Sequence, residues 1–339
     1  MWPALLILCT GCLILLPLLP ALHELVFKTD VKPLPIEHTL KGEVGFFADS
    51  FRLRVREWLR AEGPAAARLR VLTQAEPPPE ALMQLDTGTE CLALVCPEAR
   101  LPAGITLKRE LYAAGALSVQ TGSALRAVLA EGALTFGPDC TVQRWADAES
   151  IRAGEGCAFH GRLSARKCIE LGPGTAFERV SAPAMVLGSM VATPAFEPAG
   201  VLLPLPPPDR LHPLASRSTY QGALEPRKAV FHTGDLVVQG AADFPAGSRI
   251  EGSIKTHGDL RLQPHVSVQG QVVARGAITI AAHSRIAGNI MSETHIHLAS
   301  GSVVGSATQP VSVSAPRITV EPSVRVHGSM SAYEGGRIV

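Results

Sequence analysis

The amino-acid sequence predicts an all-β protein: a β-solenoid with 17–18 residues per coil, in two arrays behind an N-terminal transmembrane helix. Two consecutive stretches, GDLRLQPHVSVQGQVVAR (258–275) and GAITIAAHSRIAGNIMSE (276–293), open on glycine and place apolar or small residues at matching offsets. A series with nearly the same period runs from residue 105 to residue 183, and residues 2–22 contain no charge. Such a repeat is typical of solenoids, in which each coil stacks on the previous one.

The uncharged N-terminal stretch is long enough to cross a membrane. As a helix it extends about 31 Å, which matches the hydrocarbon core of a bilayer. No basic residue precedes it, so an anchor is favoured over a cleaved signal peptide. Lys28, Lys32 and Lys41 follow it, which predicts a single-pass protein of the cell inner membrane with a cytoplasmic body. The predicted anchor residues are Trp2, Leu5, Leu6, Ile7, Leu13, Ile14, Leu15, Leu16, Leu18 and Leu19.

The stretch that follows the predicted anchor has the pattern of an amphipathic helix. Phe47, Phe51 and Val55, with Trp58 or Leu59, recur at steps of three and four, which places them on one face. Four arginines lie elsewhere around the helix. Two interpretations remain open: a helix that lies on anionic lipid, or a helix that packs its apolar face on its own domain or on a partner.

The composition limits the classes of function. A chain of 339 residues with 46% hydrophobic residues will fold, and its net charge of +1 gives no general reason to expect nucleic acid. Seven cysteines without the dense spacing of a disulfide scaffold fit a reducing compartment. Cys91 and Cys96 have no second pair nearby, which argues against a zinc site. The sequence contains no Gly-Lys-Ser/Thr phosphate loop, so no nucleotide is expected.

The second array, residues 230–332, is a ladder of inward positions at steps of two and four. Each inward pair defines one short strand, and three strands return the chain to its starting angle. The phase continues upstream if residues 240–245 form a six-residue excursion, and downstream if a loop bulges near residues 306–312. The predicted core of this array is Leu260, Leu262, Val266, Val268, Ile278, Ile280, Ile286, Ile290, Ile318, Val320, Val324 and Val326.

The first array, residues 89–190, holds the same phase with occasional one-residue deletions. We expect these deletions at corners, because a deletion within a strand turns every following side chain to the wrong face. Its predicted inward residues include Leu134, Phe136, Cys140, Val142, Ile151, Ala153, Cys157, Phe159, Leu163, Ala165, Ile169, Leu171 and Phe177.

These patterns divide the chain into six parts. Residues 193–228 contain eight prolines, which remove ladder donors and favour an extended linker or an arm laid on the surface. The predicted parts are an anchor (1–23), a juxtamembrane region with the amphipathic helix and a connector (24–88), the first array (89–190), a proline-rich linker (191–229), the second array (230–332) and a tail (333–339).

The coil sequences resemble those of bactofilins, the polymer-forming cytoskeletal proteins of bacteria. The likeness rests on the Gly-x-[Leu/Ile]-x-[Leu/Ile/Val] openings and on a glycine near the third edge of each coil. It is clearest over residues 230–332 and continues in phase over residues 102–187. The resemblance implies a right-handed β-helix that associates end to end without nucleotide at the inner face of the membrane, in scaffolding and cell-shape roles. A membrane span and a split into two arrays depart from the plain bactofilin pattern.

The physics of stacked coils favours the same role. The terminal coils of a solenoid expose unpaired backbone groups and an apolar core end, so an uncapped end is a template for another solenoid. We therefore expect a non-enzymatic, membrane-anchored scaffold that self-associates through its β-helix ends. The expected partners are further copies of the chain, membrane lipid and unidentified envelope proteins, with no nucleic acid and no nucleotide. No catalytic, cofactor-binding or metal-binding residue is predicted.

The alternative is an enzyme, a membrane-tethered solenoid like the hexapeptide acyltransferases. Those enzymes are left-handed solenoids that also use eighteen-residue coils, and the spacing of inward residues alone does not give the handedness of a solenoid. Those enzymes usually alternate small and large inward residues, whereas Leu260 with Leu262 and Ile278 with Ile280 are both large. Catalysis needs a histidine base beside an acceptor site. The candidate bases, all at outward positions and without an obvious carboxylate partner, are His265, His283, His295 and His297.

Overall fold

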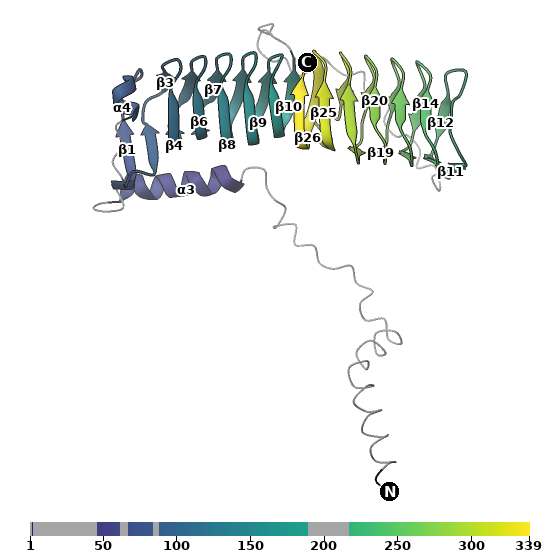
Figure 1. Cartoon of the computed structure of the whole chain (residues 1–339), viewed down its shortest axis with the longest axis horizontal. Helices are drawn as coiled ribbons and strands as arrows, with labels where there is room; N and C mark the ends of the chain where they lie inside the picture. The colour runs from purple at the N-terminus through teal and green to yellow at the C-terminus, as the bar shows by residue number, and fades with distance from the viewer. Residues whose placement is uncertain (1, 3–45, 62–66, 84–87, 189–216) are drawn as a thin grey trace. The chain divides into compact units, whose positions relative to one another are not determined.

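The fold was analysed in a computed structural model that describes residues 2, 46–61, 67–83, 88–188 and 217–339. The chain divides into two units, residues 1–46 and residues 47–339. In the second unit, strands stack coil on coil into a β-solenoid of about 13 turns (Figure 1). The prediction of a β-solenoid is thereby confirmed. All the strands of the described residues belong to one continuous sheet that winds around the axis of this rod.

The first array consists of parallel strands. Its coils begin as separate short strands and continue as long strands that bend around a corner. The strands are β1 (Leu69–Leu72), β2 (Cys91–Leu94), β3 (Glu98–Leu101), β4 (Thr106–Ala113), β5 (Ala116–Val119), β6 (Ala124–Ala130), β7 (Ala133–Phe136), β8 (Thr141–Ala153), β9 (Ala158–Leu171) and β10 (Ala176–Leu187). A short helix, α4 (Pro79–Met83), lies between β1 and β2 in the sequence.

The second array is built mostly from strands of two to four residues. Its strands are β11 (Arg217–Tyr220), β12 (Phe231–Thr233), β13 (Asp235–Val238), β14 (Ala242–Phe244), β15 (Arg249–Glu251), β16 (Ile254–Thr256), β17 (Leu260–Leu262), β18 (Ser267–Val268), β19 (Val272–Ala274), β20 (Ile278–Ile280), β21 (Arg285–Ile286), β22 (Ile290–Ser292), β23 (His295–Leu298) and β24 (Val303–Val304). Two long strands, β25 (Val311–Val320) and β26 (Val324–Ile338), complete it.

The strand register places equivalent side chains above one another. In the second array Leu260 pairs with Ile278, which pairs with Ile296, so these coils take eighteen residues. In the first array Leu117 pairs with Leu134 and Leu134 with Ile151, so these coils take seventeen. The shorter coils keep their phase because β-bulges occur between Leu125 and Ala127 and at equivalent points of β4, β8, β9 and β10, near the corners.

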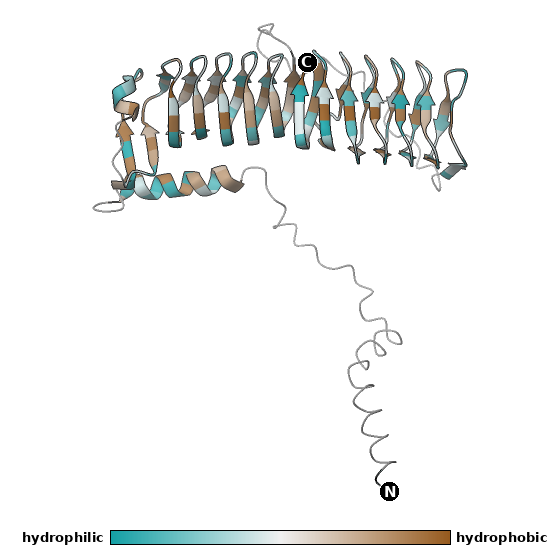
Figure 2. Cartoon of the chain, viewed as in Figure 1, coloured by the Kyte–Doolittle hydropathy of each residue, from teal (hydrophilic) through white to brown (hydrophobic). Residues whose placement is uncertain are grey.

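One apolar column fills the interior of both arrays. The inward residues named for the second array are 0–1% exposed, and those named for the first are at most 7% exposed; all of them belong to one core cluster. The visible strands carry both apolar and polar residues, as expected for strands with one face inside (Figure 2). Serines replace aliphatic residues at some inward positions. The Ser284 hydroxyl, for example, accepts a hydrogen bond from the backbone N–H of Val266 and donates one to the Gln263 carbonyl.

The excursion expected at residues 240–245 is wrong. These residues contain β14, which pairs in register with β17, and Ala242 and Phe244 are 3% and 0% exposed. The coil is therefore regular. The period is hard to read here because Ala242 is only a weak hydrophobic signal. The loop expected near residues 306–312 lies at residues 305–310, and β25 begins directly after it.

Three expected segments belong partly to the rod. Residues 69–72, within the expected juxtamembrane region and connector, form β1, which pairs with β2. Residues 217–220, within the expected proline-rich linker, form β11, which pairs with β13. Residues 333–338, expected as a tail, belong to β26 and pair with β10 and β25. Of the predicted anchor residues only Trp2 is described, and it is 87% exposed; the other nine lie outside the described residues. Among the residues that the structure places, no helix combines the length and apolarity needed to cross a bilayer.

The amphipathic helix is α3 (Phe46–Arg60), and it packs on its own domain. Phe51, Val55 and Trp58 are buried against the outward face of the first array, in a cluster that includes Tyr112 and Trp145. The ring of Phe51 lies 5.3 Å from that of Trp145 in an edge-to-face arrangement. Leu59 is 44% exposed, so Trp58 rather than Leu59 completes the buried face. Of the two interpretations of this helix, the structure supports packing on the domain.

Candidate functional site: the ends of the rod and the docked helix

The N-terminal end of the first array is covered by α4 and neighbouring residues. Leu82 of α4 is 0% exposed and belongs to the main core, and Leu72 and Cys96 pack against that core. The backbone N–H of Arg100 in β3 donates to the carbonyl of Ala75, at 2.7 Å. The connector thus seals the apolar column and pairs with part of the exposed strand edge, which is how natural solenoids protect a terminal coil.

The two arrays close each other at their C-terminal coils. Strand β10 pairs with β26 in antiparallel register, with Val180 opposite Met330 and Met185 opposite Val326. Figure 1 shows the two strands side by side in the middle of the rod. Because every other strand pair in the described residues is parallel, chain direction reverses once, at this junction.

Specific contacts fit the two C-terminal coils together. The backbone groups of Ile338 exchange hydrogen bonds with Gly174 and Thr175, each at 2.9 Å. The ring of Phe177 lies so close to Gly336 that a Cβ there would be 2.4 Å from it. The imidazole Nδ1 of His327 lies 3.0 Å from the carbonyl oxygen of Pro183. The junction is thus a fitted interface, and it leaves neither C-terminal coil available for another molecule.

The opposite end of the second array is uncovered in the described residues. Strand β11 pairs with β13 and β12 pairs with β15, and neither has a described partner on its outer edge. Tyr220 is 39% exposed and Phe231 is 66% exposed. The Nε2 atom of His232 is buried there without a hydrogen-bond partner among the described residues. Within the described residues, this end therefore has unpaired strand edges and two exposed aromatic rings, with an unsatisfied imidazole nitrogen buried near them.

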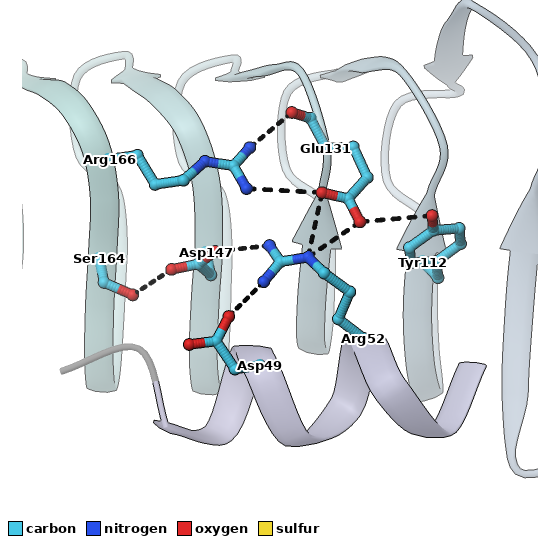
Figure 3. A network of polar contacts seen from close by, with 7 residues as sticks. All are labelled: Asp49, Arg52, Tyr112, Glu131, Asp147, Ser164 and Arg166. Carbon is cyan, nitrogen blue, oxygen red and sulfur yellow. Dashed lines mark hydrogen bonds and ion pairs between the residues drawn. The ribbon is translucent and has the colours of Figure 1, made fainter. Parts of the chain in front are cut away.

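A polar network fixes α3 on the first array (Figure 3). The Arg52 side chain, only 11% exposed, donates through Nε to the Glu131 carboxylate at 2.9 Å and lies 3.5 Å from the Asp147 carboxylate. Arg52 also pairs with Asp49 on its own helix. Arg166 of β9 donates to the Glu131 backbone carbonyl at 2.6 Å. One helical arginine thus connects α3 to successive coils of the solenoid.

Burial shifts the pKa of several groups in this network. Burial raises the pKa of Asp147, and it outweighs the hydrogen bond that Ser164 donates at 2.6 Å and the charge of Arg52. Burial followed by the charge of Glu131 raises the pKa of Tyr112. For Arg52, burial acts to lower the pKa, but the hydrogen bond and charge of Glu131 outweigh it and the pKa is raised. The network therefore holds the guanidinium firmly in its charged form.

Two of the four candidate histidines are corner residues, and the other two lie on a strand. His265 and His283 have φ of 61° and 57° at corners where other coils have Gly247 and Gly301, and their rings stack 5.3 Å apart. His295 lies on β23, where burial and the charge of His297 lower its pKa. The four do not converge on one point, since the first two occupy one corner and the others lie on a strand.

His297 has a carboxylate partner that the sequence pattern missed. Its Nε2 lies 3.0 Å from Glu321, which also accepts hydrogen bonds from the backbone N–H and hydroxyl of Ser300. The hydrogen bond from the Ser300 backbone, more than the one from His297, lowers the pKa of Glu321. Glu321 follows His297 by 24 residues because an insertion lengthens that coil. These contacts fasten one corner to the next coil.

No family model, no curated protein and no solved structure matches the chain. Any functional conclusion therefore depends on the geometry of the rod.

Proposed function

We propose that this protein is a non-enzymatic, membrane-anchored structural scaffold of the bactofilin-like kind, which self-associates through the N-terminal end of its second array. In this proposal the solenoid is a right-handed β-helix, and residues 1–23 hold it at the inner membrane with its body in the cytoplasm.

The observation that carries the proposal is the difference between the ends of the solenoid. The start of the first array is covered by the connector, and the two C-terminal coils cover each other. The end formed by β11 and β12 has unpaired strand edges within the described residues and exposes Tyr220 and Phe231. Unpaired strand edges readily pair with another chain, and aromatic residues are enriched at protein interfaces.

The chemistry of this end supports a second copy of the chain as its partner. The β10–β26 junction demonstrates that two coils of this solenoid type can meet in antiparallel register with their cores aligned. Two identical ends that meet in the same way form an isologous, two-fold contact. Since the described part of each chain offers one such end, the proposed assembly is a pair of rods joined end to end.

The test is the oligomeric state of the full-length chain in detergent micelles, measured by light scattering and by negative-stain electron microscopy. We expect paired rods for the wild-type chain and single rods for the double variant Tyr220→Asp and Phe231→Asp, because buried charge opposes association. Met291→Asp is the matched control, since Met291 is 50% exposed on the flank of the second array. Single rods in the wild type, or pairing that survives the double variant, contradict the proposal.

A further inference from the structure

One corner of the first array carries a stripe of positive charge. It lies where the strands bend, at the bulges between Leu107 and Glu110 and at the equivalent points of the next coils. Coils are about 4.8 Å apart, so cations at equivalent positions form a closely spaced row. Lys108, Arg109, Arg126 and Arg144 lie within these bulges, and the stripe continues with Arg162 and Arg179, one register position further along, in line with Trp145.

The stripe has more cations than carboxylates. Glu110 and Glu178 are the acidic residues at the same corner positions, and Glu110 lies 3.8 Å from Arg144. Lys108 and Arg126 are exposed and have no ion-pair partner among the described residues. Burial followed by the charge of Arg179 lowers the pKa of Arg162, as expected for two neighbouring guanidinium groups that repel each other. An anion placed here relieves this repulsion.

Three of these cations surround one shallow hollow. The hollow has a volume of about 400 Å³, and Lys108, Arg126 and Arg144 contribute to its lining together with Thr106, Leu107, Ala124 and Gln143. Its cations come from three successive coils, so several charges converge on one place. Arginine and lysine side chains in this arrangement suit phosphate oxygens, which accept several charge-assisted hydrogen bonds at once.

The stripe runs beside α3, which adds exposed apolar side chains. The Arg162 guanidinium lies 5.1 Å from the centre of the Phe47 ring, and Trp145, next to Arg144 in the sequence, contacts Phe51 of α3. On α3, Leu53 is 61% exposed and Leu59 is 44% exposed. Cationic and apolar side chains next to one another are typical of proteins that lie on an anionic membrane surface.

We propose that this corner of the first array binds the phosphate headgroups of anionic lipids and lays the rod along the membrane. The inference rests on the membrane attachment in the proposed function and adds the face that meets the bilayer. Single-stranded nucleic acid fits the stripe less well, because the uncharged residues between its cations in the hollow are not aromatic and offer no stacking surface.

The full-length chain itself supplies the probe. Its three tryptophans are Trp2, Trp58 and Trp145, so in a Trp2→Phe background the other two report on the α3 face. This chain is reconstituted into vesicles of phosphatidylcholine alone, or of phosphatidylcholine with phosphatidylglycerol, each with a trace of dansyl-labelled lipid. Energy transfer from tryptophan to dansyl measures how close the face lies to the bilayer. We expect higher transfer in the anionic vesicles and a decrease at high salt.

The decisive variant replaces Lys108, Arg126 and Arg144 by Glu. Each cation near an anionic surface favours binding about fivefold, so losing three lowers the ratio of docked to undocked chains on the order of a hundredfold. If circular dichroism shows that the Glu variant misfolds, a variant with Gln at the same three positions replaces it, and we expect it also to lower energy transfer in anionic vesicles. The matched control is Lys255→Glu, Arg275→Glu and Arg285→Glu, which makes the same charge change on exposed positions of the second array.

Several outcomes contradict the inference. The first is equal energy transfer in neutral and anionic vesicles, and the second is an equal loss of energy transfer in the control variant. The third is displacement of the chain by inorganic polyphosphate with no dependence on lipid charge, which reassigns the stripe to a soluble polyanion. Rod pairing is measured separately, so its failure concerns the proposed function alone. Separation of the wild-type chain from neutral vesicles on flotation contradicts the membrane anchor of the proposed function. Binding of the chain to anionic vesicles still tests the role of the stripe in that case.

Discussion

In the first array, strands β8, β9 and β10 run for 12–14 residues around a corner, whereas in the second array β17 to β22 have two or three residues each. The first array also carries α3, which packs on the outward residues of strands from β1 to β8. The inward residues of both arrays nevertheless form one apolar column. The comparison teaches that the interior fixes the coil, while the corners and outward positions are free to differ. The features with functional potential lie on those outward positions and at the ends.

The largest expected effect comes from a charge placed where the arrays meet. Met330 is 1% exposed and opposite Val180, so Met330→Asp buries a carboxylate at the junction. We expect a loss of roughly 2–7 kcal/mol and separate unfolding of the two arrays, because an unpaired polar group is poorly tolerated in an apolar core. Scanning calorimetry and circular dichroism measure this. A single transition at the wild-type temperature would show that the junction is dispensable.

A pair of core truncations compares the two arrays directly. Leu134 and Leu262 are both 0% exposed, in the first and second arrays respectively. Each Leu→Ala change should lower the free energy of unfolding by about 2–5 kcal/mol, because each leaves a cavity in a similar column. Denaturant titration of the two variants checks this. A cost confined to one array would contradict the view that both share the same core.

Removal of the helical arginine tests the feature present in the first array alone. Arg52→Ala leaves the Glu131 and Asp147 carboxylates without their buried cation. We expect a loss of about 1–3 kcal/mol and release of α3, seen as a change in tryptophan fluorescence and as faster proteolysis near residue 60. Arg60→Ala is the control, since Arg60 is exposed at the end of the same helix. Equal behaviour of the two variants would contradict the role of Arg52.

The smallest expected effect is a pH dependence confined to the same place. Since burial raises the pKa of Asp147 in the folded protein, its contribution to stability is fully present below the ordinary Asp pKa and is lost as pH rises through the raised value. Asp147→Asn should remove this loss while Ser164→Ala, which deletes the hydrogen bond to the carboxylate, should enlarge it. Denaturation midpoints measured across the acidic range would reveal this, and parallel curves for Asp147→Asn and the wild type would argue against it.

The repeat was predictable from the sequence because the inward residues of a solenoid recur at fixed sequence intervals. The alternation of Leu260 and Leu262 with polar neighbours, repeated at Ile278 and Ile280, defines both the strand and the coil. The amphipathic spacing of α3 was readable for the same reason. The coil containing Ala242 and Phe244 was not, since Ala242 is a weak hydrophobic signal at an inward position.

The contacts that matter for function were not readable, because they join segments with no common period. The Arg52–Asp147 pair connects positions 95 residues apart, and the His327–Pro183 contact connects positions 144 apart. The antiparallel pairing of β10 with β26 carries no repeat signal, since it joins the last coils of two separate series. An excess of arginine near the bends of the first array was present in the sequence, but its alignment into a stripe depends on where each bulge falls.

The antiparallel junction has a consequence for how such a rod can change its length. Because the last coils of both arrays meet in the middle, each array grows outward from a fixed centre. Duplication of a whole coil in either arm moves that arm's tip and leaves the central joint untouched. The lengths of the two arrays can thus change independently of each other.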